Sequence, residues 1–476
     1  VLFRSAYRGK TPLVLIAGEI AAGAKNKTQS MDQRRFAEAS SARFFTISSI
    51  DNMAEEIAEA FYAARVNRIP VVLNLPMDLQ EDEFDWDYAY RPSTDFLPAR
   101  ALSPSPDALA PVIEKLAAAE RPVIIAGRGA QAAQARDEII RLADRVGALL
   151  ATSLQAKGYF AGHPWDIGIA GAFASAPSEQ LLAEADFVLG VGAELGYYTT
   201  EGGLLFPSAE VARIDIKAMP EEIGVIPGLW VQGDARRTVA AINEALEAHQ
   251  VRKDGFRTDD ARTVLETPPP AVEPPTDGLD PRPLARALGA ALPKGALLTC
   301  GAGHFFSWIG MYAPLPEGAE IQYSYGFGAV GQGIGVAIGT AAGNPGRPHV
   351  AVEGDGSLMF NLQELETVVR HKLPMVLVVW NDAGYGAEVH KLIAKGFDET
   401  LAQWPSPDFV ALAKAFGGDG VLLKQVDDLG PAIQEGLRRG GLYLIDARVS
   451  PTMATDPYAK VHYGQESRAP LLRPVA

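Results

Sequence analysis

Two apolar runs, each ending at a turn that carries an aspartate, constrain this chain more than any other feature. The first run, residues 349–352, leads into the Gly-Asp-Gly sequence of residues 354–356. The second, residues 375–380, leads into Asn-Asp at 381–382 and another glycine-rich turn. Unbroken apolar runs of this length are typical of parallel strands that are covered on both faces. The sequence therefore predicts two buried strands that end at tight, carboxylate-bearing turns.

The segment between the two runs has the pattern of a helix. Asn361 and Glu364 have the spacing of a capping box, and apolar residues then recur on one helical face. Pro374 ends the helix. Asp355 and Asp382 are therefore separated by one strand-helix-strand unit. We expect both at the carboxyl edge of one sheet, where open α/β sheets bind ligands.

Two carboxylates at one sheet edge are suitable ligands for a hard cation. Asp355, Asp382 and a backbone carbonyl of the second turn would suit Mg²⁺. The alternative is two ordinary turns after strands. A Gly-Asp-Gly turn alone does not decide between these interpretations, but the complete strand-helix-strand unit favours the metal site.

Residues 354–388 resemble the diphosphate-binding signature of thiamin diphosphate (ThDP) enzymes, in which a Gly-Asp-Gly turn is followed, after a spacer, by a pair of asparagines. The resemblance implies that Mg²⁺ is bound by Asp355, Asp382 and the carbonyl of Gly384. It implies cofactor contacts for Gly354, Gly356, Ser357, Tyr385 and Gly386. The sequence departs from the pattern at Asp382, where the family has its second asparagine. Aspartate offers the same oxygen with more charge, so we expect Mg²⁺ binding to be retained.

The wider organisation resembles the acetolactate synthase / 2-oxo acid decarboxylase branch of that family. It implies an α/β fold of three doubly wound parallel-sheet domains. The expected divisions are a partial pyrimidine-binding domain (1–95), a central domain (107–250), a proline-rich linker (251–279), a diphosphate-binding domain (280–450) and a C-terminal tail (451–476). The central domain of this branch binds FAD, a nucleotide or nothing, and the glycine-rich residues 127–132 and 192–198 do not decide which.

The first of these domains contains only about half of the material that a domain needs to close its own core. The chain has no initiator methionine, and residues 1–5 lead abruptly into a strand. We therefore expect the N-terminal half of the pyrimidine-binding domain to be missing. The resemblance places the glutamate that activates ThDP in that half, and Glu19 follows a different strand. The chain as given is accordingly expected to be incomplete and inactive.

Residues 326–331 read Gly-x-Gly-x-x-Gly after a plausible strand. Taken alone, this motif suggests a dinucleotide fold and an NAD-dependent dehydrogenase. No acidic residue follows at the end of a second strand about twenty residues later, as that fold requires. By resemblance to the ThDP enzymes, the Gly328 carbonyl would accept a hydrogen bond from the aminopyrimidine. Val330 would be the apolar wedge beneath the cofactor, with simple helix packing as its alternative role.

A second glycine-rich turn, residues 301–304, follows another strand. Its backbone NH groups and a histidine suit a diphosphate oxygen, and a similar turn contacts the diphosphate in acetolactate synthases. We therefore expect Gly303 and His304 to bind the cofactor. A purely structural role is the alternative for His304.

Two further residues are candidates for catalysis. In pyruvate decarboxylases a glutamate at the place of Glu388 faces the substrate, and a carboxylate there could transfer protons. The alternative is a glutamate favoured by the start of a helix. Gln29 resembles a pocket-facing glutamine of this branch, although a solvated loop is an equally good interpretation.

Composition excludes several classes of function. The net charge is −15 without a basic patch, which argues against nucleic acid or an anionic membrane surface as a partner. The single cysteine, Cys300, excludes an internal disulfide and fits a reducing cytoplasm. No segment has the pattern of a signal peptide or of a membrane span.

The sequence therefore predicts a ThDP- and Mg²⁺-dependent lyase or carboligase that acts on a small 2-oxo acid. By resemblance its partner is a second copy of itself, in a homodimer or tetramer. Two alternatives are retained. One is a degenerate ThDP-binding protein without catalysis, and the other is the NAD-dependent dehydrogenase suggested by residues 326–331.

Overall fold

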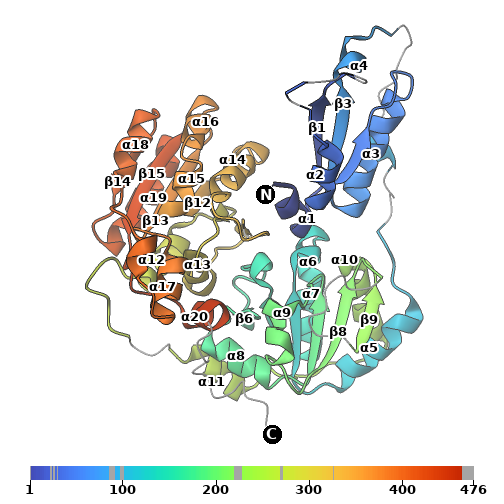
Figure 1. Cartoon of the computed structure of the whole chain (residues 1–476). Helices are drawn as coiled ribbons and strands as arrows, with labels where there is room; N and C mark the ends of the chain where they lie inside the picture. Colours follow the sequence, from blue (N-terminus) through green and yellow to red (C-terminus); the bar gives the residue numbers. More distant parts are fainter. Residues whose placement is uncertain are drawn as a thin grey trace. The chain divides into compact units, whose positions relative to one another are not determined.

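The structure is a computed structural model, shown in Figure 1, that describes residues 2–21, 24, 27–28, 30–84, 92–96, 101–218, 228–268, 272–324 and 326–463. The chain divides into two units. The first comprises residues 1–100 and 325–329, and the second comprises residues 101–324 and 330–476. Each unit is built on parallel sheets and is described by itself.

The first unit contains a three-stranded parallel sheet in the order β1-β3-β2. Its elements are α1 (Leu2–Arg8), β1 (Leu13–Glu19), α2 (Gln33–Ala39), β2 (Arg43–Thr46), α3 (Met53–Asn67), β3 (Pro70–Pro76), α4 (Met77–Glu81) and η1 (Ser93–Phe96). Ala60, Ala63 and Ala64 of α3 lie in one core cluster with Val71 and Leu73 of β3. These small side chains let the helix pack closely on the sheet.

The second unit contains two six-stranded parallel sheets, of which the central one has the order β6-β5-β4-β7-β8-β9. Its strands are β4 (Pro122–Ala126), β5 (Leu149–Thr152), β6 (Asp166–Ile169), β7 (Phe187–Val191), β8 (Glu210–Asp215) and β9 (Leu229–Gln232). Its helices are α5 (Pro106–Ala118), α6 (Arg128–Ala132), α7 (Arg136–Val146), η2 (Leu154–Ala156), α8 (Ala176–Ala183), α9 (Tyr197–Thr200), η3 (Glu201–Gly203), α10 (Ala235–Ala248) and α11 (Asp259–Glu266). This strand order is doubly wound and reverses beside β4.

Alternate residues of β4 serve two separate cores, as the period of a strand requires. Ile124 packs on one face with residues of α5, α7 and α10. Val123 and Ile125 pack on the other face with residues of α8 and α11. The expected linker 251–279 thus contains a helix, α11, and the buried Phe256, both of which belong to this second core.

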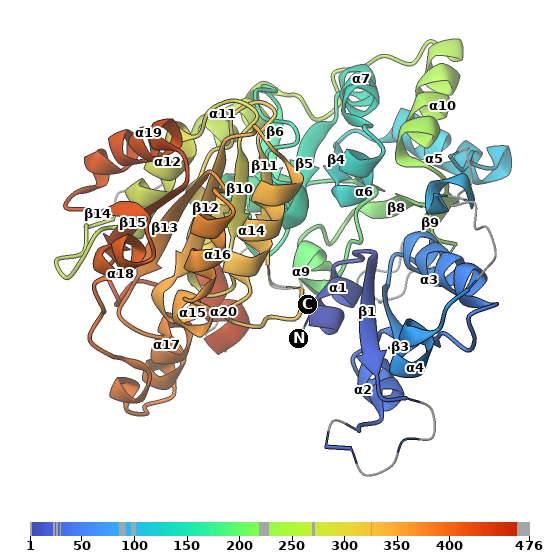
Figure 2. The same cartoon turned by 90° about the horizontal axis from the view of Figure 1, so that it is seen from above.

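The C-terminal sheet has the order β11-β10-β12-β13-β15-β14. Its strands are β10 (Leu297–Cys300), β11 (Glu320–Tyr323), β12 (His349–Gly354), β13 (Met375–Asn381), β14 (Asp419–Leu422) and β15 (Leu442–Arg448). Its helices are α12 (Pro281–Ala291), α13 (Phe305–Tyr312), α14 (Gly333–Gly343), α15 (Asp355–Phe360), α16 (Glu364–Arg370), α17 (Gly386–Ala394), η4 (Glu399–Ala402), α18 (Phe409–Ala415), η5 (Val426–Asp428), α19 (Leu429–Arg439) and α20 (Asp456–Tyr463). Figure 2 shows α12 and α19 on one face of this sheet and α14, α16 and α18 on the other.

The apolar runs predicted as strands lie within β12 and β13, whose residues are all buried. The predicted capping box is wrong. Helix α16 begins at Glu364 without a side-chain cap, and the Asn361 side chain instead donates a hydrogen bond of 2.6 Å to the Gly331 carbonyl. The Asn361 side chain therefore makes a tertiary contact with Gly331 instead of the helix-capping contact that the local pattern predicted.

The two sheets of the second unit are joined through α13. The Lys157 ammonium, just after η2, donates a hydrogen bond of 2.8 Å to the Gly310 carbonyl of α13. The Phe173 ring meets the Phe306 ring edge-on, with 5.2 Å between the ring centroids. Helix α13, which begins directly after His304, is therefore held by the central domain at Phe306 in its first turn and at Gly310 in its last turn.

The predicted fold class is confirmed, because the chain consists of three parallel-sheet α/β domains. Among the residues that the structure describes, no helix has the length and apolar character that crossing a membrane requires.

Candidate active site

The two predicted carboxylates lie side by side at the carboxyl edge of the C-terminal sheet. Strands β12 and β13 are paired in parallel with Gly354 opposite Trp380, so Asp355 and Asp382 begin adjacent turns. Their residues are only 1% and 8% exposed. Burial, and then the Asp382 carboxylate, raise the pKa of Asp355 to about 8. Two buried acids this close need either a shared proton or a cation between them.

The turn after β13 is fixed by hydrogen bonds to its own strand end and to Asp355. The Gly384 NH donates to Asp355 Oδ2 at 3.1 Å, and the Ala383 NH donates to Asn381 Oδ1 at 3.2 Å. The Asn381 amide in turn donates to Asp446 Oδ1 at 2.8 Å. These contacts hold the turn that contains Gly384 against Asp355.

His304 meets this carboxylate pair from the turn after β10. His304 Nε2 lies 2.7 Å from Asp382 Oδ2, and both side chains are almost completely buried. The His304 ring also lies beside the rings of His390 and Tyr458, with centroids 5.2 and 6.1 Å away. Burial, and then the His304 charge, lower the pKa of His390 to about 4. His304 therefore contacts an acid at this edge, a partner that the sequence did not suggest.

Ser357 connects the Gly-Asp-Gly turn to the end of the glycine-rich segment 326–331. Its hydroxyl accepts a hydrogen bond of 2.8 Å from the Gly331 NH. Together with the bond from Asn361 to the Gly331 carbonyl, this contact fixes Gly331 against α15. The residues leading into α14 are therefore anchored to the same edge of the sheet.

Aromatic rings cover Gly356. The Tyr385 and Trp404 rings meet edge-on at 75°, with centroids 4.6 Å apart, and the centroid of the Phe360 ring lies 6.1 Å from that of Tyr385. A Cβ atom at Gly356 would lie 2.8 Å from the Tyr385 ring and 2.9 Å from Trp404. The glycine is thus required for close packing of the Gly-Asp-Gly turn beneath these rings.

The remaining predicted site residues lie in different environments. Glu388 is exposed on the first turn of α17, and its charge acts on the buried Tyr458, whose pKa burial raises. Val330 is 41% exposed. Gly328 has a φ of 71° and belongs to the first unit. Gln29 lies outside the described residues.

The sequence analysis missed Glu353 and Tyr458. Glu353 is 1% exposed, and its carboxylate fills the space left by Gly301 and Gly333. Burial raises its pKa to about 7. An acid within an otherwise apolar run was the signal for Glu353. Tyr458 lies in the tail after residue 451, which carries no periodic pattern that could have revealed it.

The donor set fits Mg²⁺ together with a diphosphate. Asp355, Asp382 and the carbonyl of Gly384 offer oxygen ligands only, which is the preference of Mg²⁺. Within the described parts of the chain, no group of three or more His, Cys, Asp or Glu side chains is arranged to hold a metal. A cation bound by Asp355 and Asp382 would therefore need backbone and ligand oxygens as well. A buried acid pair would gain a compensating positive charge from it.

Comparison with known proteins agrees with this geometry. Residues 301–447 match the family described as thiamine pyrophosphate enzyme, C-terminal TPP binding domain, and residues 109–242 match the thiamine pyrophosphate enzyme central domain. Thiamine pyrophosphate is another name for ThDP. The two matches together span more than half of the chain and include Asp355, Asp382 and His304. The protein belongs to the thiamine pyrophosphate enzyme family.

Curated relatives are similar over most of the chain. A sulfoacetaldehyde acetyltransferase of Alcaligenes xylosoxydans xylosoxydans is 26% identical, over 91% of this chain and 77% of the relative. A probable acetolactate synthase large subunit of Methanococcus aeolicus is 25% identical, over 86% of this chain and 72% of the relative. The probable 2-ketoarginine decarboxylase AruI of Pseudomonas aeruginosa is 29% identical, over 93% and 79%. The predicted membership in the acetolactate synthase / decarboxylase branch is confirmed.

Proposed function

We propose that this protein is a Mg²⁺- and ThDP-dependent lyase or carboligase that acts on a small 2-oxo acid. The observation that carries the proposal is the buried pair Asp355 and Asp382 at the end of adjacent parallel strands. A cation there would compensate both charges and bind the diphosphate. ThDP, when bound, supplies an electron sink for cleaving the bond beside a carbonyl group.

The residues of this chain would then divide the remaining work. Asp355, Asp382 and the Gly384 carbonyl would hold the cation. The turns at Gly354, Gly356 and Ser357, at Tyr385 and Gly386, and at Gly303 and His304 would surround the diphosphate. The Gly328 carbonyl would orient the aminopyrimidine, and the Val330 side chain would support the cofactor from below.

Glu388 would exchange a proton with the substrate at its reacting carbonyl carbon. Its exposed position at the start of α17 leaves the carboxylate accessible. Gln29 would contribute a hydrogen bond to the substrate. The relatives carry the names of an acetyltransferase, a synthase and a decarboxylase, so both carboligation and decarboxylation agree with the family.

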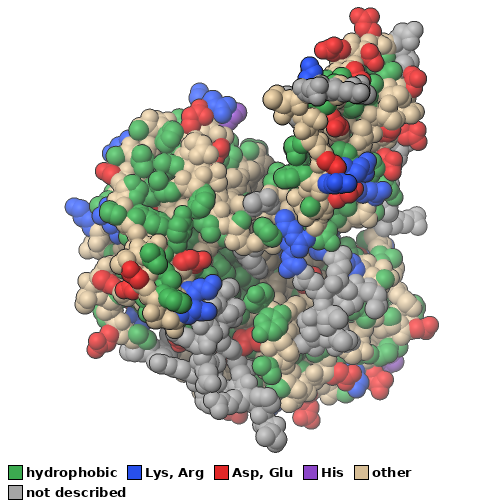
Figure 3. All heavy atoms as spheres, in the orientation of Figure 1, with side chains coloured by type: hydrophobic (Ala, Val, Ile, Leu, Met, Phe, Trp, Pro, Cys, Tyr) green, Lys and Arg blue, Asp and Glu red, His purple; other side chains and the backbone are tan. Residues whose placement is uncertain are grey.

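The exposed apolar surface of α15 and α17 supports a second copy as partner. Figure 3 shows hydrophobic side chains gathered over this region of the second unit. The exposed apolar residues of these elements and of the segment after α17 are Met359 and Phe360 of α15, Ile393 of α17, Phe397, and Leu401 of η4, which are between 45% and 78% exposed. Apolar groups in such number on one face are typical of an interaction surface. We propose that a second copy of the chain covers them.

The dinucleotide alternative has weaker support. The Gly-x-Gly-x-x-Gly segment follows β11, which is the edge strand of its sheet. Dinucleotides bind where the strand order reverses, which in this sheet is between β10 and β12. Gly331 is moreover bonded on both its NH and its carbonyl, to Ser357 and Asn361.

Ligand binding and turnover test the proposal in sequence. ThDP with Mg²⁺ should raise the melting temperature, because a ligand at 100 times its Kd stabilises the folded state by about 2.7 kcal/mol. NAD should not. CO₂ release from a panel of small 2-oxo acids then identifies the substrate. The proposal is wrong if ThDP with Mg²⁺ causes no shift while NAD does.

A further inference from the structure

His304 and Asp382 form a buried pair that stands out among the contacts of the candidate site. The distance between His304 Nε2 and Asp382 Oδ2 is 2.7 Å, and the two side chains are 4% and 6% exposed. The residues come from different strand ends, 78 positions apart. The contact is therefore a product of the fold and not of local geometry.

The surroundings of the ring make this contact specific. Asp382 is the only hydrogen-bond partner found for the His304 ring among the residues that the structure describes, and His304 Nδ1 has none. The His390 and Tyr458 rings enclose it. The Ser307 hydroxyl donates a hydrogen bond of 2.6 Å to the His304 carbonyl, and the Thr455 hydroxyl donates one of 2.9 Å to the Ser307 hydroxyl. These two bonds fix the backbone of the turn that carries His304.

Gly386 provides independent support for a function of the pair. A Cβ atom at Gly386 would overlap both the Asp382 carboxylate and the His304 ring. Its φ is not among the positive values, so backbone conformation does not explain the glycine. Because Gly386 has no side chain, the Asp382 carboxylate and the His304 ring can come into contact beside it.

The pair also accounts for the residue type at position 382. The family pattern has an asparagine here, which carries both an acceptor oxygen and a donor NH₂ group. An aspartate has two acceptor oxygens and more charge, and it needs a donor to hold its second oxygen. With both carboxylates ionised around a cation, His304 Nε2–H is that donor.

We propose that His304 is a positioning residue for Asp382. It donates a hydrogen bond to one carboxylate oxygen so that the other faces Asp355 and the cation. The asparagine of the family pattern has an NH₂ group in place of that oxygen and so does not need this donor. This inference rests on the proposed function, because it concerns the same metal site. It differs from the direct contact with diphosphate that the sequence resemblance implied for His304.

A set of variants tests the proposal through Mg²⁺ affinity. Mg²⁺ is titrated at saturating ThDP and ThDP binding is followed by tryptophan fluorescence, which needs no turnover. His304→Phe keeps a ring but removes the donor, and it should weaken Mg²⁺ binding by about 10- to 100-fold, the usual cost of losing a group that orients a metal ligand. His304→Gln retains a donor of similar reach and should bind within about 3-fold of wild type.

The double variant separates this role from a direct contact with the cofactor. In the Asp382→Asn background, His304→Phe should change Mg²⁺ affinity by less than about 3-fold, because the asparagine no longer needs the histidine. An equal loss in both backgrounds would overturn the proposal, as would a His304→Phe variant with wild-type affinity. His371→Phe, at an exposed histidine after α16, is the matched control and should bind normally.

Two further measurements keep the result interpretable. If His304→Phe does not fold, Gly386→Ala perturbs the same contact with both partners retained, and it should weaken Mg²⁺ binding while His304→Gln does not. Unchanged Mg²⁺ binding by Gly386→Ala would overturn the proposal. If wild-type protein binds no ThDP with Mg²⁺, the proposed function itself has failed, whereas normal wild-type binding with unaffected variants rejects only the role of His304.

Discussion

The two six-stranded sheets of the second unit use glycine at their switch points in opposite ways. In the central sheet the order reverses between β4 and β7, and the turns after these strands touch: the Gly129 NH donates to the Gly192 carbonyl at 2.9 Å. In the C-terminal sheet the order reverses between β10 and β12, where Gly301, after β10, and Gly333, at the start of α14, leave the space that the buried Glu353 carboxyl group of β12 fills. In the central sheet, glycine after a strand thus allows two backbone segments to approach each other. In the C-terminal sheet, it allows a carboxyl group to approach the backbone.

The acids at the two edges differ in the same way. Asp215, at the end of β8, receives a hydrogen bond of 2.5 Å from the Arg213 guanidinium, which lies over the Trp230 ring. Across the described residues, neither Asp355 nor Asp382 pairs with a lysine or arginine. The central sheet pairs its acid with an arginine, whereas in the described residues of the C-terminal sheet Asp355 and Asp382 have no lysine or arginine partner.

Replacing one aspartate by asparagine at each of these two sheet edges should give the largest difference between the sheets in ThDP binding and in stability. Asp355→Asn should weaken Mg²⁺-dependent ThDP binding by about 100-fold without loss of stability, because the neutral amide replaces a carboxyl group whose pKa burial and Asp382 already raise to about 8. Asp215→Asn should leave ThDP binding unchanged but cost about 3 kcal/mol, because it leaves Arg213 buried without a full counter-charge. Isothermal titration and urea unfolding of both variants measure the two effects.

The contrast between the two edges is wrong if either variant shows the effect expected of the other. Loss of ThDP binding in Asp215→Asn would give the central edge a part in the site. A large loss of stability in Asp355→Asn would show that the carboxylate is structural.

The glycines themselves provide the next contrast. Gly192 has a φ of 54°, and a Cβ atom there would overlap the backbone of Gly129 and Ala130. Gly192→Ala should therefore cost about 3 kcal/mol, since neither backbone can yield. Gly354→Ala is the matched variant, because its Cβ would lie 3.0 Å from the Phe305 ring, a side chain that can shift. Its loss in urea unfolding should be clearly smaller, and equal losses would remove the distinction between the two switch points.

The strands and the Asp355–Asp382 edge could be predicted from sequence because each depends on short-range signals. Apolar runs mark β12 and β13, and an Asp in each following turn marks the shared edge. The His304–Asp382 bond could not be predicted, because it depends on the order of β10, β12 and β13 in the sheet. The residues that connect two parallel strands do not indicate which strands become neighbours in the sheet.

Two other failures have the same cause. The local pattern predicted that Asn361 caps a helix, but the fold places Gly331 beside it, and the Asn361 amide donates a hydrogen bond to the Gly331 carbonyl. Tyr458 and Thr455 pack against the His304 turn from a segment without periodicity. Local pattern identifies elements, whereas the partners of polar side chains depend on which elements become neighbours.

The contact between the two sheets should be visible in the pH dependence of stability. Burial lowers the pKa of Lys157 from 10.5 to about 8. Between these values the unfolded chain binds the proton and the folded chain does not, so this group makes stability rise with pH by about 2 kcal/mol. Lys157→Met should remove that rise. The free energy of urea unfolding at pH 8 and pH 10 measures it, as the difference between wild type and variant.

Lys115→Met is the control for this measurement, because Lys115 forms an exposed ion pair with Glu210 on the central sheet. Its pH profile should match wild type over this interval. A Lys157→Met profile that also matches wild type would mean that the ammonium at the joint of the two sheets is not desolvated.

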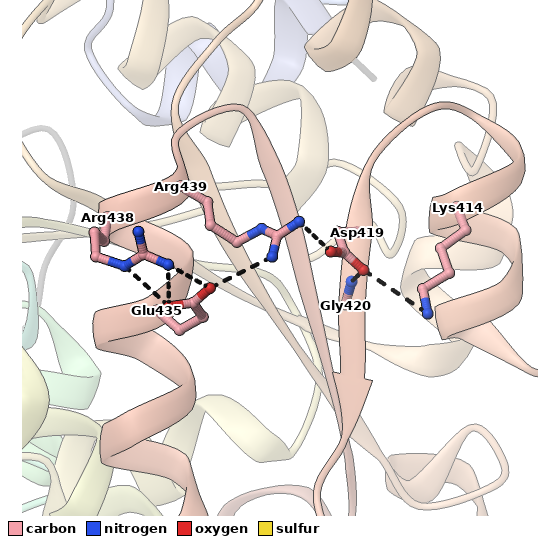
Figure 4. A network of polar contacts seen from close by, with 6 residues as sticks. All are labelled: Lys414, Asp419, Gly420, Glu435, Arg438 and Arg439. Atoms are coloured by element: carbon pink, nitrogen blue, oxygen red, sulfur yellow. Dashed lines mark hydrogen bonds and ion pairs between the residues drawn. The ribbon is translucent and has the colours of Figure 1, made fainter.

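The outer edge of the C-terminal sheet should give the smallest effect and so completes the comparison within one domain. Figure 4 shows Asp419 of β14 between Arg439 and Lys414, and Glu435 between Arg438 and Arg439. The Arg439 and Asp419 side chains are 47% and 34% exposed, so water screens their attraction and ordering them costs entropy. Arg439→Ala should therefore change the melting temperature by no more than about 2 °C and leave ThDP binding intact. A larger loss would mean that charges at the rim contribute substantially to the stability of this sheet.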